Sequence, residues 1–512
     1  MKLQKLTKES LSTIVGKRIC CIECSQEYLE EFIAKYDVLD YIEVIIDNNE
    51  NKQGEVCLQG RIIPVSAINY LEGADANEYV VIITGDYYRE QFDYLNSNRE
   101  LKHKFETIYY FANQETEYEE EFRNLYRESP LQNIIIFRSG PQINSYIKGM
   151  DFTDNARALF EYMLENGYNK KYKLVWMVKE PDEFENYLYH ENVCFLPLKW
   201  AKSVDWSERK QYYEVLCLAK FIFFTDAYGI ARNARKDQVR VQLWHGCGFK
   251  TRLNFQPCEK RYEYMTVSSD LYAMIHAKLF GLRKEQLLAT GYPKQDWILK
   301  MEQRDYREIL GFPFAKKYIF WLPTYRQAKD VLDQKKGYIL NSEFGLPVVN
   351  SIEKMRMLNT ILQNEKVVLV IKLHPYQKKE LITDFCFSNI VFVDNEQLYR
   401  YDIQINQLLS MADALISDYS SVAVDFLLLN RPMAFMLQDL SVYEERRGFI
   451  FDDVRKYLPG KEIYGLEDVC LFVEEISQGI DTLKSKREGL KSILNNYDDG
   501  NCSKRIIECL GI

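Results

Sequence analysis

The sequence lacks an apolar segment long enough to cross a lipid bilayer. Its longest apolar stretches, around 133–137 and 367–371, have the length of buried strands. The basic N-terminus, 1–8, is not followed by the apolar core of a signal peptide. We therefore expect a protein that is made and kept in the cytoplasm.

Positive charge is also in deficit. The chain of 512 residues has 66 Lys and Arg against 75 Asp and Glu, which gives a formal net charge of −9. An acidic chain is a poor general binder of polyanions, so a nucleic-acid partner is not expected. Affinity for phosphates or for a membrane must then come from local basic patches, of which the stretch 231–240 is the most basic.

Metal-ligating patterns are scarce as well. The 12 cysteines are scattered, many of them inside apolar runs, and we interpret them as reduced core thiols. Cys21 and Cys24 form a Cys-x-x-Cys pair, but its strand-like setting would point the two thiols to different faces of a sheet. Carboxylates with metal-ligand spacing do not stand out either. We therefore predict neither a required metal nor a cofactor.

Short apolar runs that alternate with amphipathic stretches are abundant, almost from end to end. This alternation predicts an α/β protein whose strands are covered by helices on both faces. A chain of this length is too long for one hydrophobic core. We predict a small Rossmann-like N-terminal domain over 1–130, followed by two Rossmann-type domains over 131–310 and 311–512 that face a cleft.

The strands of the first domain are predicted at 18–24, 42–47, 79–85 and 107–111, those of the second at 133–137, 172–178, 193–198, 221–225, 239–244 and 264–267, and those of the third at 318–321, 367–373, 390–393, 414–416 and 432–436. The turn after the first strand contains no glycine, so its backbone cannot approach a pyrophosphate closely. Dinucleotide binding by the first domain is therefore not expected. An acidic helical stretch, 115–128, is predicted to connect this domain to the second.

Histidine is rare, with five in the chain, and two of them end predicted strands. The first is His245, behind the strand at 239–244. Gly246 and Gly248 would clear room for a ligand there, and Lys250 adds a cation. Ligands of open α/β sheets bind at this carboxyl end of the strands. The combination favours a functional histidine over a core histidine beside a glycine turn.

The second of these histidines, His374, ends the strand predicted at 367–373. Pro375 cannot continue the strand and turns the chain. By the two-residue period of a strand, Lys372 lies on the same face as His374. The pattern alone is weak, but together with the first histidine it favours a second functional group.

A third pattern follows the strand predicted at 414–416. The chain runs into Asp418, and Ser420 and Ser421 stand where a helix is predicted to begin. Free main-chain N–H groups, the helix dipole and two hydroxyl groups would form an anion site there without glycine. Two ordinary N-cap serines would give the same pattern, so both interpretations stay open.

Two further segments are compatible with such a site. Arg326 follows the strand predicted at 318–321, where a guanidinium group can hold a phosphate. A surface arginine that caps the strand end is the equal alternative. The turn 289–296 would either contact a ligand or close the seam between the second and third domains.

The order of the motifs is more specific than any one of them. His-Gly-x-x-x-Lys-Thr, Gly-x-Pro-x-x-Asp, Pro-Thr-Tyr-Arg, His-Pro and Ser-Asp-Tyr-Ser-Ser-x-x-x-Asp-Phe, in this order, resemble the CDP-glycerol glycerophosphotransferase family of teichoic-acid primases, polymerases and capsule relatives. The resemblance covers about 131–512. The family often has Thr-Pro-Leu where 247–249 stand, and many members have Trp at Tyr325. These departures leave the polyol and the acceptor open.

The resemblance implies a GT-B-like fold and the transfer of a polyol phosphate, with glycerol phosphate favoured, from a CDP-polyol donor with release of CMP. By position, His245 and His374 correspond to the family's two essential histidines, and Ser420 and Ser421 to its donor-phosphate serines. The implied acceptor is a lipid-linked or oligosaccharide chain of teichoic-acid or capsular type. Such acceptors place the enzyme at the cytoplasmic face of the membrane as a peripheral protein.

In the mechanism that we expect, an acceptor hydroxyl attacks the β-phosphorus of the CDP-polyol. His245 would accept the proton of that hydroxyl. His374, with Lys372 and Arg326, would stabilise the pyrophosphate and the leaving CMP. The substrate-binding residues that we predict are Gly246, Lys250, Arg326, Lys372, Asp418, Ser420 and Ser421.

Two other functions are alternatives at this point. One is a GT-B sugar transferase that uses a nucleotide sugar, although we can place no Glu-x7-Glu pair in the third domain. The other is a non-catalytic nucleotide-binding scaffold, which would need neither both histidines nor both serines. The basic stretch 231–240 would dock on an anionic membrane, bind acceptor phosphates or form a solvated loop.

Overall fold

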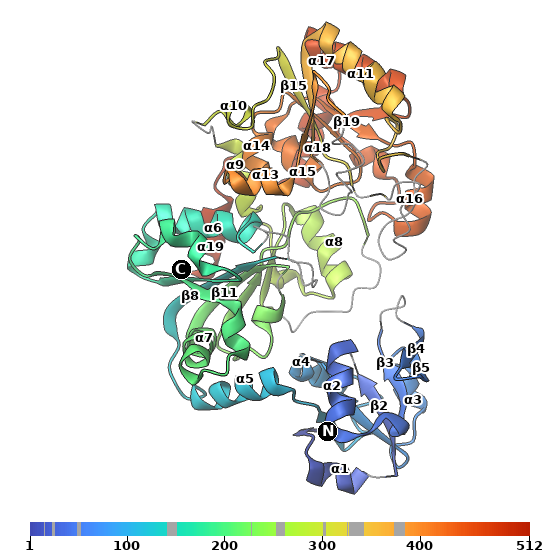
Figure 1. Ribbon diagram of the computed structural model, residues 1–512, viewed down its shortest axis with the longest axis vertical. Helices are drawn as coiled ribbons and strands as arrows, with labels where there is room; N and C mark the ends of the chain where they lie inside the picture. Colours follow the sequence, from blue (N-terminus) through green and yellow to red (C-terminus); the bar gives the residue numbers. More distant parts are fainter. Residues whose placement is uncertain are drawn as a thin grey trace. The chain divides into compact units, whose positions relative to one another are not determined.

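The structure of the protein is a computed structural model (Figure 1). It describes residues 1–512 except 15, 23–25, 49–52, 86, 141–150, 227, 252–261, 301–303, 325, 327–341 and 373–384. The chain divides into two compact units, one formed by 1–138, 167–241 and 254–263 and the other by 139–166, 242–253 and 264–512. Within the described part of the chain, we find no helix whose length and apolar character would let it span a membrane.

The first sheet is built by the N-terminal residues, blue in Figure 1, with the strand order β1-β7-β6-β2-β3-β5-β4. Its strands are β1 (Lys2–Lys5), β2 (Arg18–Ile22), β3 (Ile42–Ile46), β4 (Gly54–Leu58), β5 (Arg61–Ser66), β6 (Tyr79–Ile83) and β7 (Thr107–Tyr110), and its helices are α1 (Lys8–Ile14), α2 (Gln26–Tyr36), α3 (Tyr70–Gly73), α4 (Tyr88–Ser97) and α5 (Gln114–Leu125). Strand β4 pairs with β5 as an antiparallel hairpin, and the neighbours of β2 are parallel to it. The central order is that of a Rossmann-like sheet, as the sequence predicted.

Strand β2 shows how this sheet is covered on both faces. Ile19 and Cys21 belong to one buried hydrophobic cluster, and Cys20 and Ile22 belong to another. The alternation follows the two-residue period of a strand. Cys21 is therefore a buried core thiol, as predicted, whereas Cys24 lies outside the described residues.

The second sheet has the order β10-β9-β8-β11-β12-β13-β14. Its strands are β8 (Gln132–Ser139), β9 (Lys173–Val178), β10 (Val193–Pro197), β11 (Ala219–Thr225), β12 (Val239–Gln242), β13 (Tyr264–Thr266) and β14 (Leu287–Leu288), and the helices between and after them are α6 (Asp154–Glu165), α7 (Trp206–Leu218), α8 (Asp270–Phe280) and α9 (Pro293–Leu299). The first six strands follow the order 3-2-1-4-5-6 of a Rossmann sheet, which the sequence predicted as a Rossmann-type domain.

The third sheet repeats this order as β17-β16-β15-β18-β19-β20, with parallel neighbours throughout. Its strands are β15 (Lys317–Trp321), β16 (Val367–Lys372), β17 (Ile390–Val393), β18 (Ala414–Ser417), β19 (Met433–Met436) and β20 (Lys461–Ile463). The helices of this part are α10 (Tyr306–Ile309), α11 (Ile352–Glu365), α13 (Asn395–Arg400), α14 (Ile405–Leu409), α15 (Val422–Phe426), α16 (Leu440–Arg447), α17 (Leu466–Gln478), α18 (Lys484–Leu494) and α19 (Cys502–Leu510). The order changes direction between β15 and β18, and ligands of such sheets bind at this switch point.

Helix α5 is the acidic connector that the sequence predicted, and it packs within the first unit. The ring of Phe122 stacks on Tyr213 of α7 with centroids 5.3 Å apart. The buried carboxylate of Glu119 accepts a hydrogen bond from Arg123 Nε at 2.6 Å and another from Arg232 Nε at 3.1 Å. Burial alone would raise the pKa of Glu119, but the two guanidinium groups outweigh it and hold that pKa below its ordinary value.

The basic stretch 231–240 is bound inside the same unit. Arg232 forms an ion pair with Glu115 as well as with Glu119. Arg235 donates to the carbonyl oxygen of Ser129 at 2.7 Å and pairs with an aspartate two residues on. These guanidinium groups are engaged by protein oxygens, which disfavours the interpretation of this stretch as a membrane anchor.

We expect Glu119→Ala to lower the free energy of unfolding by about 3 kcal/mol, because it leaves the buried guanidinium group of Arg123 without its carboxylate and removes one of the two carboxylates that pair with Arg232. Urea unfolding followed by tryptophan fluorescence measures the change. Since the pKa of Glu119 is lower in the folded protein, its stabilisation is present above the ordinary pKa and is lost as the pH falls through the folded-state pKa. The difference between the variant and the wild type should therefore shrink in acid.

The control is Glu508→Ala, which removes the exposed partner of Lys504 and should stay within about 0.5 kcal/mol of the wild type. A loss for Glu119→Ala as small as that of this control would contradict the importance of the buried network.

Candidate functional site

Two strand ends meet at the switch point of the third sheet. Strand β15 pairs with β18, and the segments that follow them carry Arg326 and Asp418. Arg326 Nη1 donates to Asp418 Oδ2 at 2.6 Å, and the main-chain N–H of Thr324 donates to the same oxygen at 2.8 Å. The structure thus brings together two residues that the sequence separates by more than 90 positions.

Arg326 is fully buried, although the sequence predicted a guanidinium group that reaches a phosphate. Its Nε and Nη2 atoms donate to the carboxylate of Asp439, with Nη2 to Oδ1 at 3.1 Å. The rings of Tyr419 and Tyr443 lie 5.8 and 5.9 Å from its guanidinium carbon. Protein carboxylates therefore engage all three guanidinium nitrogens, and the residue fixes the chain at Asp418.

The charge of Asp418 follows from this environment. Burial alone would raise the pKa of its carboxyl group, but Arg326 and Lys250 outweigh burial and hold that pKa below its ordinary value. Asp418 is therefore an anion in the folded protein, and it fixes the start of the turn that contains Ser420 and Ser421.

The turn at Ser421 lies directly against the loop of His245. A Cβ atom on Gly246 would lie 3.0 Å from Ser421 Oγ, and a Cβ on Gly248 would lie 3.2 Å from the main-chain N of Ser421. Gly246 also has φ of +128°, a region that side chains disfavour. The sequence predicted that these glycines clear room for a ligand; in the structure they let the His245 loop rest on Ser421.

Ser420 and Ser421 precede α15 and are both partly exposed. The side chain of Ser421 makes no capping hydrogen bond to the main chain of this helix. Of the two interpretations that the sequence left open, the geometry disfavours an ordinary N-cap for Ser421. A hydroxyl beside His245 that does not serve the helix fits a ligand contact.

His245 itself is exposed at the end of an irregular strand. Strand β12 ends at Gln242, two residues before the predicted end, because Trp244 has φ of +53° and cannot continue it. This conformation is held from two sides: the N–H of Trp244 donates to Gln242 Oε1 at 2.8 Å, and its carbonyl accepts from Asn155 Nδ2 at 2.7 Å. The rings of Trp244 and His245 lie 4.0 Å apart.

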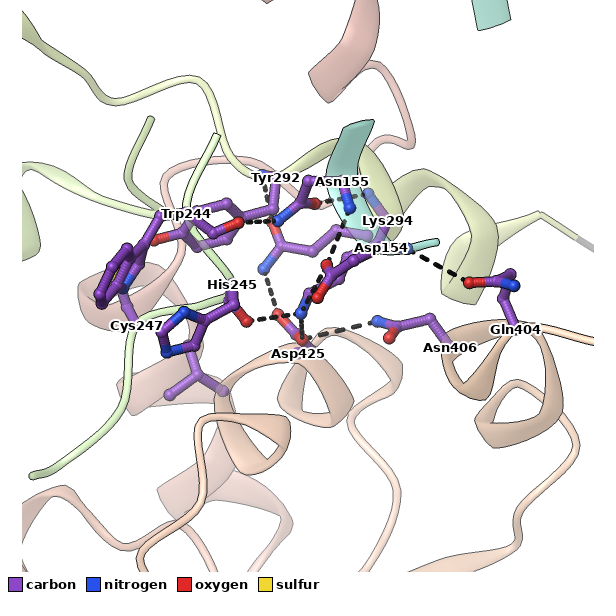
Figure 2. Close-up of polar contacts among 12 residues, drawn as sticks. Asp154, Asn155, Trp244, His245, Cys247, Tyr292, Lys294, Gln404, Asn406 and Asp425 are labelled. Carbon is purple, nitrogen blue, oxygen red and sulfur yellow. Dashed lines mark hydrogen bonds and ion pairs between the residues drawn. The ribbon is translucent and has the colours of Figure 1, made fainter. Parts of the chain in front are cut away.

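Lys294, in α9, contacts this loop at the main chain of His245 (Figure 2). Its Nζ donates to the carbonyl oxygen of His245 at 2.6 Å. The same ammonium group forms ion pairs with Asp154 Oδ1 at 3.2 Å and with Asp425 Oδ2 at 3.8 Å. Three acceptors from three segments therefore surround one ammonium group, which has three N–H donors.

Asp425, in α15, completes this cluster. Its Oδ1 accepts a hydrogen bond from Gln295 Nε2 at 2.9 Å, and Asn406 Nδ2 lies 3.5 Å from its Oδ2 (Figure 2). Burial raises the pKa of the Asp425 carboxyl above its ordinary value, and Lys294 acts against that rise. The helix that follows Ser421 is thus connected to Lys294, and through it to His245.

The turn 289–296 packs against α19, near the end of the chain. Asp296 caps α19 by accepting the N–H groups of Cys502 at 2.8 Å and Ser503 at 2.9 Å. Gly291 has φ of +80°, and a Cβ there would collide with the sulfur of Cys502. Of the two roles predicted for this turn, the structure shows the structural one, since the turn packs on α19. Lys294, which lies in the same segment, also contacts the His245 loop.

Lys250 lies in the same loop as His245, two residues after Gly248. It forms an isolated antiparallel bridge with Phe449, and the N–H of Ile450 donates to the carbonyl of Phe249 at 2.9 Å. The segment 448–450, which follows α16, thus supports the loop that carries Lys250.

Lys372 is the last residue of β16 and is partly exposed at the carboxyl edge of the third sheet, next to β15. His374 lies outside the described residues, so its predicted role stays a prediction. Sequence reasoning missed Asp439, Asn155, Lys294 and the role of Asp425. Lys294 and Asp425 lie inside motifs that were noted, but nothing in those motifs showed that the two would pair.

Comparison with known proteins identifies the family. Residues 131–511 match the family described as CDP-Glycerol:Poly(glycerophosphate) glycerophosphotransferase. The chain is 27% identical over 383 residues to the teichoic acid glycerol-phosphate primase of Bacillus subtilis (strain 168), covering 70% of this chain and 89% of the relative. It is 24% identical over 408 residues to the teichoic acid glycerol-phosphate transferase of Staphylococcus aureus (strain NCTC 8325 / PS 47), covering 74% and 93%.

Among solved structures, the chain is similar to the wall teichoic acid polymerase TagF, with a TM-score of 0.58 and 20% identity over 77% of this chain and 93% of that one. A variant of TagF soaked with CDPG gives the same TM-score with 18% identity, over 83% of this chain and 97% of that one. The likeness confirms the predicted GT-B-like fold of Rossmann-type domains. With a family match that covers about three quarters of its length, the chain belongs to the CDP-glycerol:poly(glycerophosphate) glycerophosphotransferase family.

Proposed function

We propose that the protein transfers glycerol phosphate from CDP-glycerol to a hydroxyl group of a teichoic-acid-like acceptor and releases CMP. One observation carries this proposal: Gly246 and Gly248 pack on Ser421, so the loop that carries the predicted base lies against one of the two predicted donor-phosphate serines. Glycerol is favoured over ribitol because the relatives described above act on glycerol phosphate by name.

In the proposed reaction, the acceptor oxygen attacks the β-phosphorus of CDP-glycerol. The bond between that phosphorus and the bridging oxygen breaks, and the bridging oxygen leaves with CMP. His245 takes the proton of the attacking hydroxyl, for which its exposed position at the loop is suitable. Such phosphoryl transfer depends on alignment and on charge stabilisation.

The roles of the other residues follow from their positions. Ser420 and Ser421 hold the donor phosphates, and Lys250 and Lys372 supply positive charge near them. His374 stabilises the leaving CMP, as the resemblance implies. We assign Arg326 a positioning role, because two aspartates engage its guanidinium group, and Asp418 is the residue it positions.

The acceptor that we propose is lipid-linked, with the enzyme working peripherally at the cytoplasmic face of the membrane. The guanidinium groups of Arg232 and Arg235 are bound within the first unit, so docking would use another surface. The alternatives considered above, a sugar transferase and a scaffold, gain no support from the relatives or from the site.

The donor preference tests this function directly. Incubated with a glycerol-phosphate-primed acceptor, the wild-type protein should release CMP from CDP-glycerol faster than from CDP-ribitol, and should release no UDP from UDP-sugars. Chromatography of the nucleotide products measures all three rates. Faster turnover of CDP-ribitol would change the polyol, and turnover of a UDP-sugar alone would support the sugar transferase.

His245→Ala should lower the rate of CMP release by about 10²-fold or more, because it removes the general base. The affinity for CDP-glycerol should change little. The matched control is His190→Ala, which removes another exposed imidazole and should keep the wild-type rate. CMP release by His245→Ala at a rate close to that of this control would remove His245 from the mechanism.

Ser421→Ala should weaken binding of CDP-glycerol by about 10- to 100-fold, because it removes a hydrogen bond to a charged phosphate. Isothermal titration calorimetry measures the affinity without turnover of an acceptor. Ser492→Ala removes an exposed serine hydroxyl that bonds only locally, to the carbonyl of Gly489, and should bind as the wild type does. Normal binding by both variants would place the donor phosphates elsewhere.

A further inference from the structure

The cluster around Lys294 stands out because it acts on His245 without using its imidazole ring. Lys294 Nζ donates to the main-chain carbonyl of His245, while two aspartates hold the ammonium group (Figure 2). The side chain of Lys294 is 10% exposed and that of Asp425 4% exposed, so this is a largely buried charge cluster. A buried ion pair often stabilises a protein no more than apolar residues of similar volume would. A contribution to stability is therefore a poor explanation for this charge cluster.

The backbone at this point needs an anchor. Trp244 has φ of +53° and Gly246 has φ of +128°, so His245 is flanked by two residues in left-handed or extreme conformations. Such conformations persist when surrounding contacts determine them. Asn155 fixes the carbonyl of Trp244, and its Oδ1 accepts the main-chain N–H of Lys294 at 3.1 Å. Two consecutive carbonyls of the loop are therefore held by neighbouring parts of one network.

The network also connects the His245 loop to α15, the helix that follows the predicted donor-phosphate serines. Asp425 lies in α15, the helix that begins immediately after Ser421, and it pairs with Lys294. A Cβ on Gly246 would lie 3.7 Å from Lys294 Nζ and 3.0 Å from Ser421 Oγ. Lys294 is thus placed between the His245 loop and the helix of the serine turn.

We propose that Lys294 is the positioning residue for His245: held by Asp154 and Asp425, its ammonium group fixes the His245 carbonyl and thereby the direction of the imidazole toward the acceptor hydroxyl. This role rests on the proposed function of His245 as the base. Lys294 acts through the main chain, so its loss misplaces the base without removing a donor contact.

A double-mutant cycle tests the proposal, with kcat and KM for CDP-glycerol measured at saturating acceptor. Lys294→Met should lower kcat by about 10- to 100-fold, the size expected when a catalytic group is misplaced by about 1 Å, and should leave KM within about 2-fold. Lys294→Arg, which keeps the charge, should recover part of this loss. In the His245→Ala background, adding Lys294→Met should change kcat by less than about 2-fold.

The control is Lys316→Met. Lys316 Nζ also donates to a main-chain carbonyl at 2.6 Å, that of Ser477, and Lys316 precedes β15, at the opposite end of that strand from the segment of Arg326. It should keep the wild-type kcat and KM. If Lys294→Met does not fold, Asp154→Asn is the second variant: it weakens the hold on the ammonium group, keeps an oxygen for the N–H of Asn155, and should lower kcat but not raise KM.

The outcomes distinguish the positioning role of Lys294 from the proposed role of His245 as the base. An equal loss of kcat from Lys294→Met in the wild-type and His245→Ala backgrounds would overturn the positioning role, and so would a loss confined to KM. Wild-type turnover by Lys294→Met together with slow turnover by His245→Ala would overturn the positioning role alone. Wild-type turnover by His245→Ala would overturn both proposals.

Discussion

The close contact between two glycines and Ser421 is the constraint on which the site depends. The main chain of the His245 loop rests on the serine turn, and a single Cβ atom at Gly246 or Gly248 would push the two apart. The proposed reaction needs such a contact, because a base on one loop and a hydroxyl on another must reach one phosphate group. In the same loop Trp244 has φ of +53°, a conformation that a residue other than glycine keeps only where surrounding contacts determine it. The hydrogen bonds from Asn155 and Lys294 hold the loop in this conformation.

The anchors on the two sides of the contact have the same design. Under the His245 loop, Lys294 is paired with Asp154 and Asp425; at the serine turn, Arg326 is paired with Asp418 and Asp439. Each cation pairs with two carboxylates from distant parts of the chain. Hydrogen bonds are directional, so they fix the orientation of the groups they join, which apolar contacts do not. A buried charge also has few alternative positions, because leaving its partners unpaired is costly. These pairs therefore define positions more than they add stability, which suits a reaction that depends on alignment.

The sequence predicted the buried parallel strands well and the edges poorly. Five of the six strands of the third sheet lie within one residue of their predicted bounds, because a strand covered on both faces is a continuous apolar run, whereas the edge strand β20 was not predicted. The edge strand β1, in which Lys2 and Gln4 are exposed, and the β4–β5 hairpin were missed, since half-exposed strands lack that signal. At the site, residue type and strand ends predicted Ser421 and His245, and the structure brings the segments that carry them into contact. They misjudged Arg326, whose environment depends on Asp439, a residue 113 positions further on.

Lys294 marks the limit of what local motifs can reveal. Its three acceptors come from the start of α6, from the loop behind β12 and from α15, and only the fold brings these segments together. The chemistry explains why an anchor of this kind suits a base. An imidazole that is to accept a proton from a substrate cannot be fixed by burial, because its ring must stay accessible. A cation that holds the carbonyl fixes the residue through its main chain and makes no demand on the ring nitrogens.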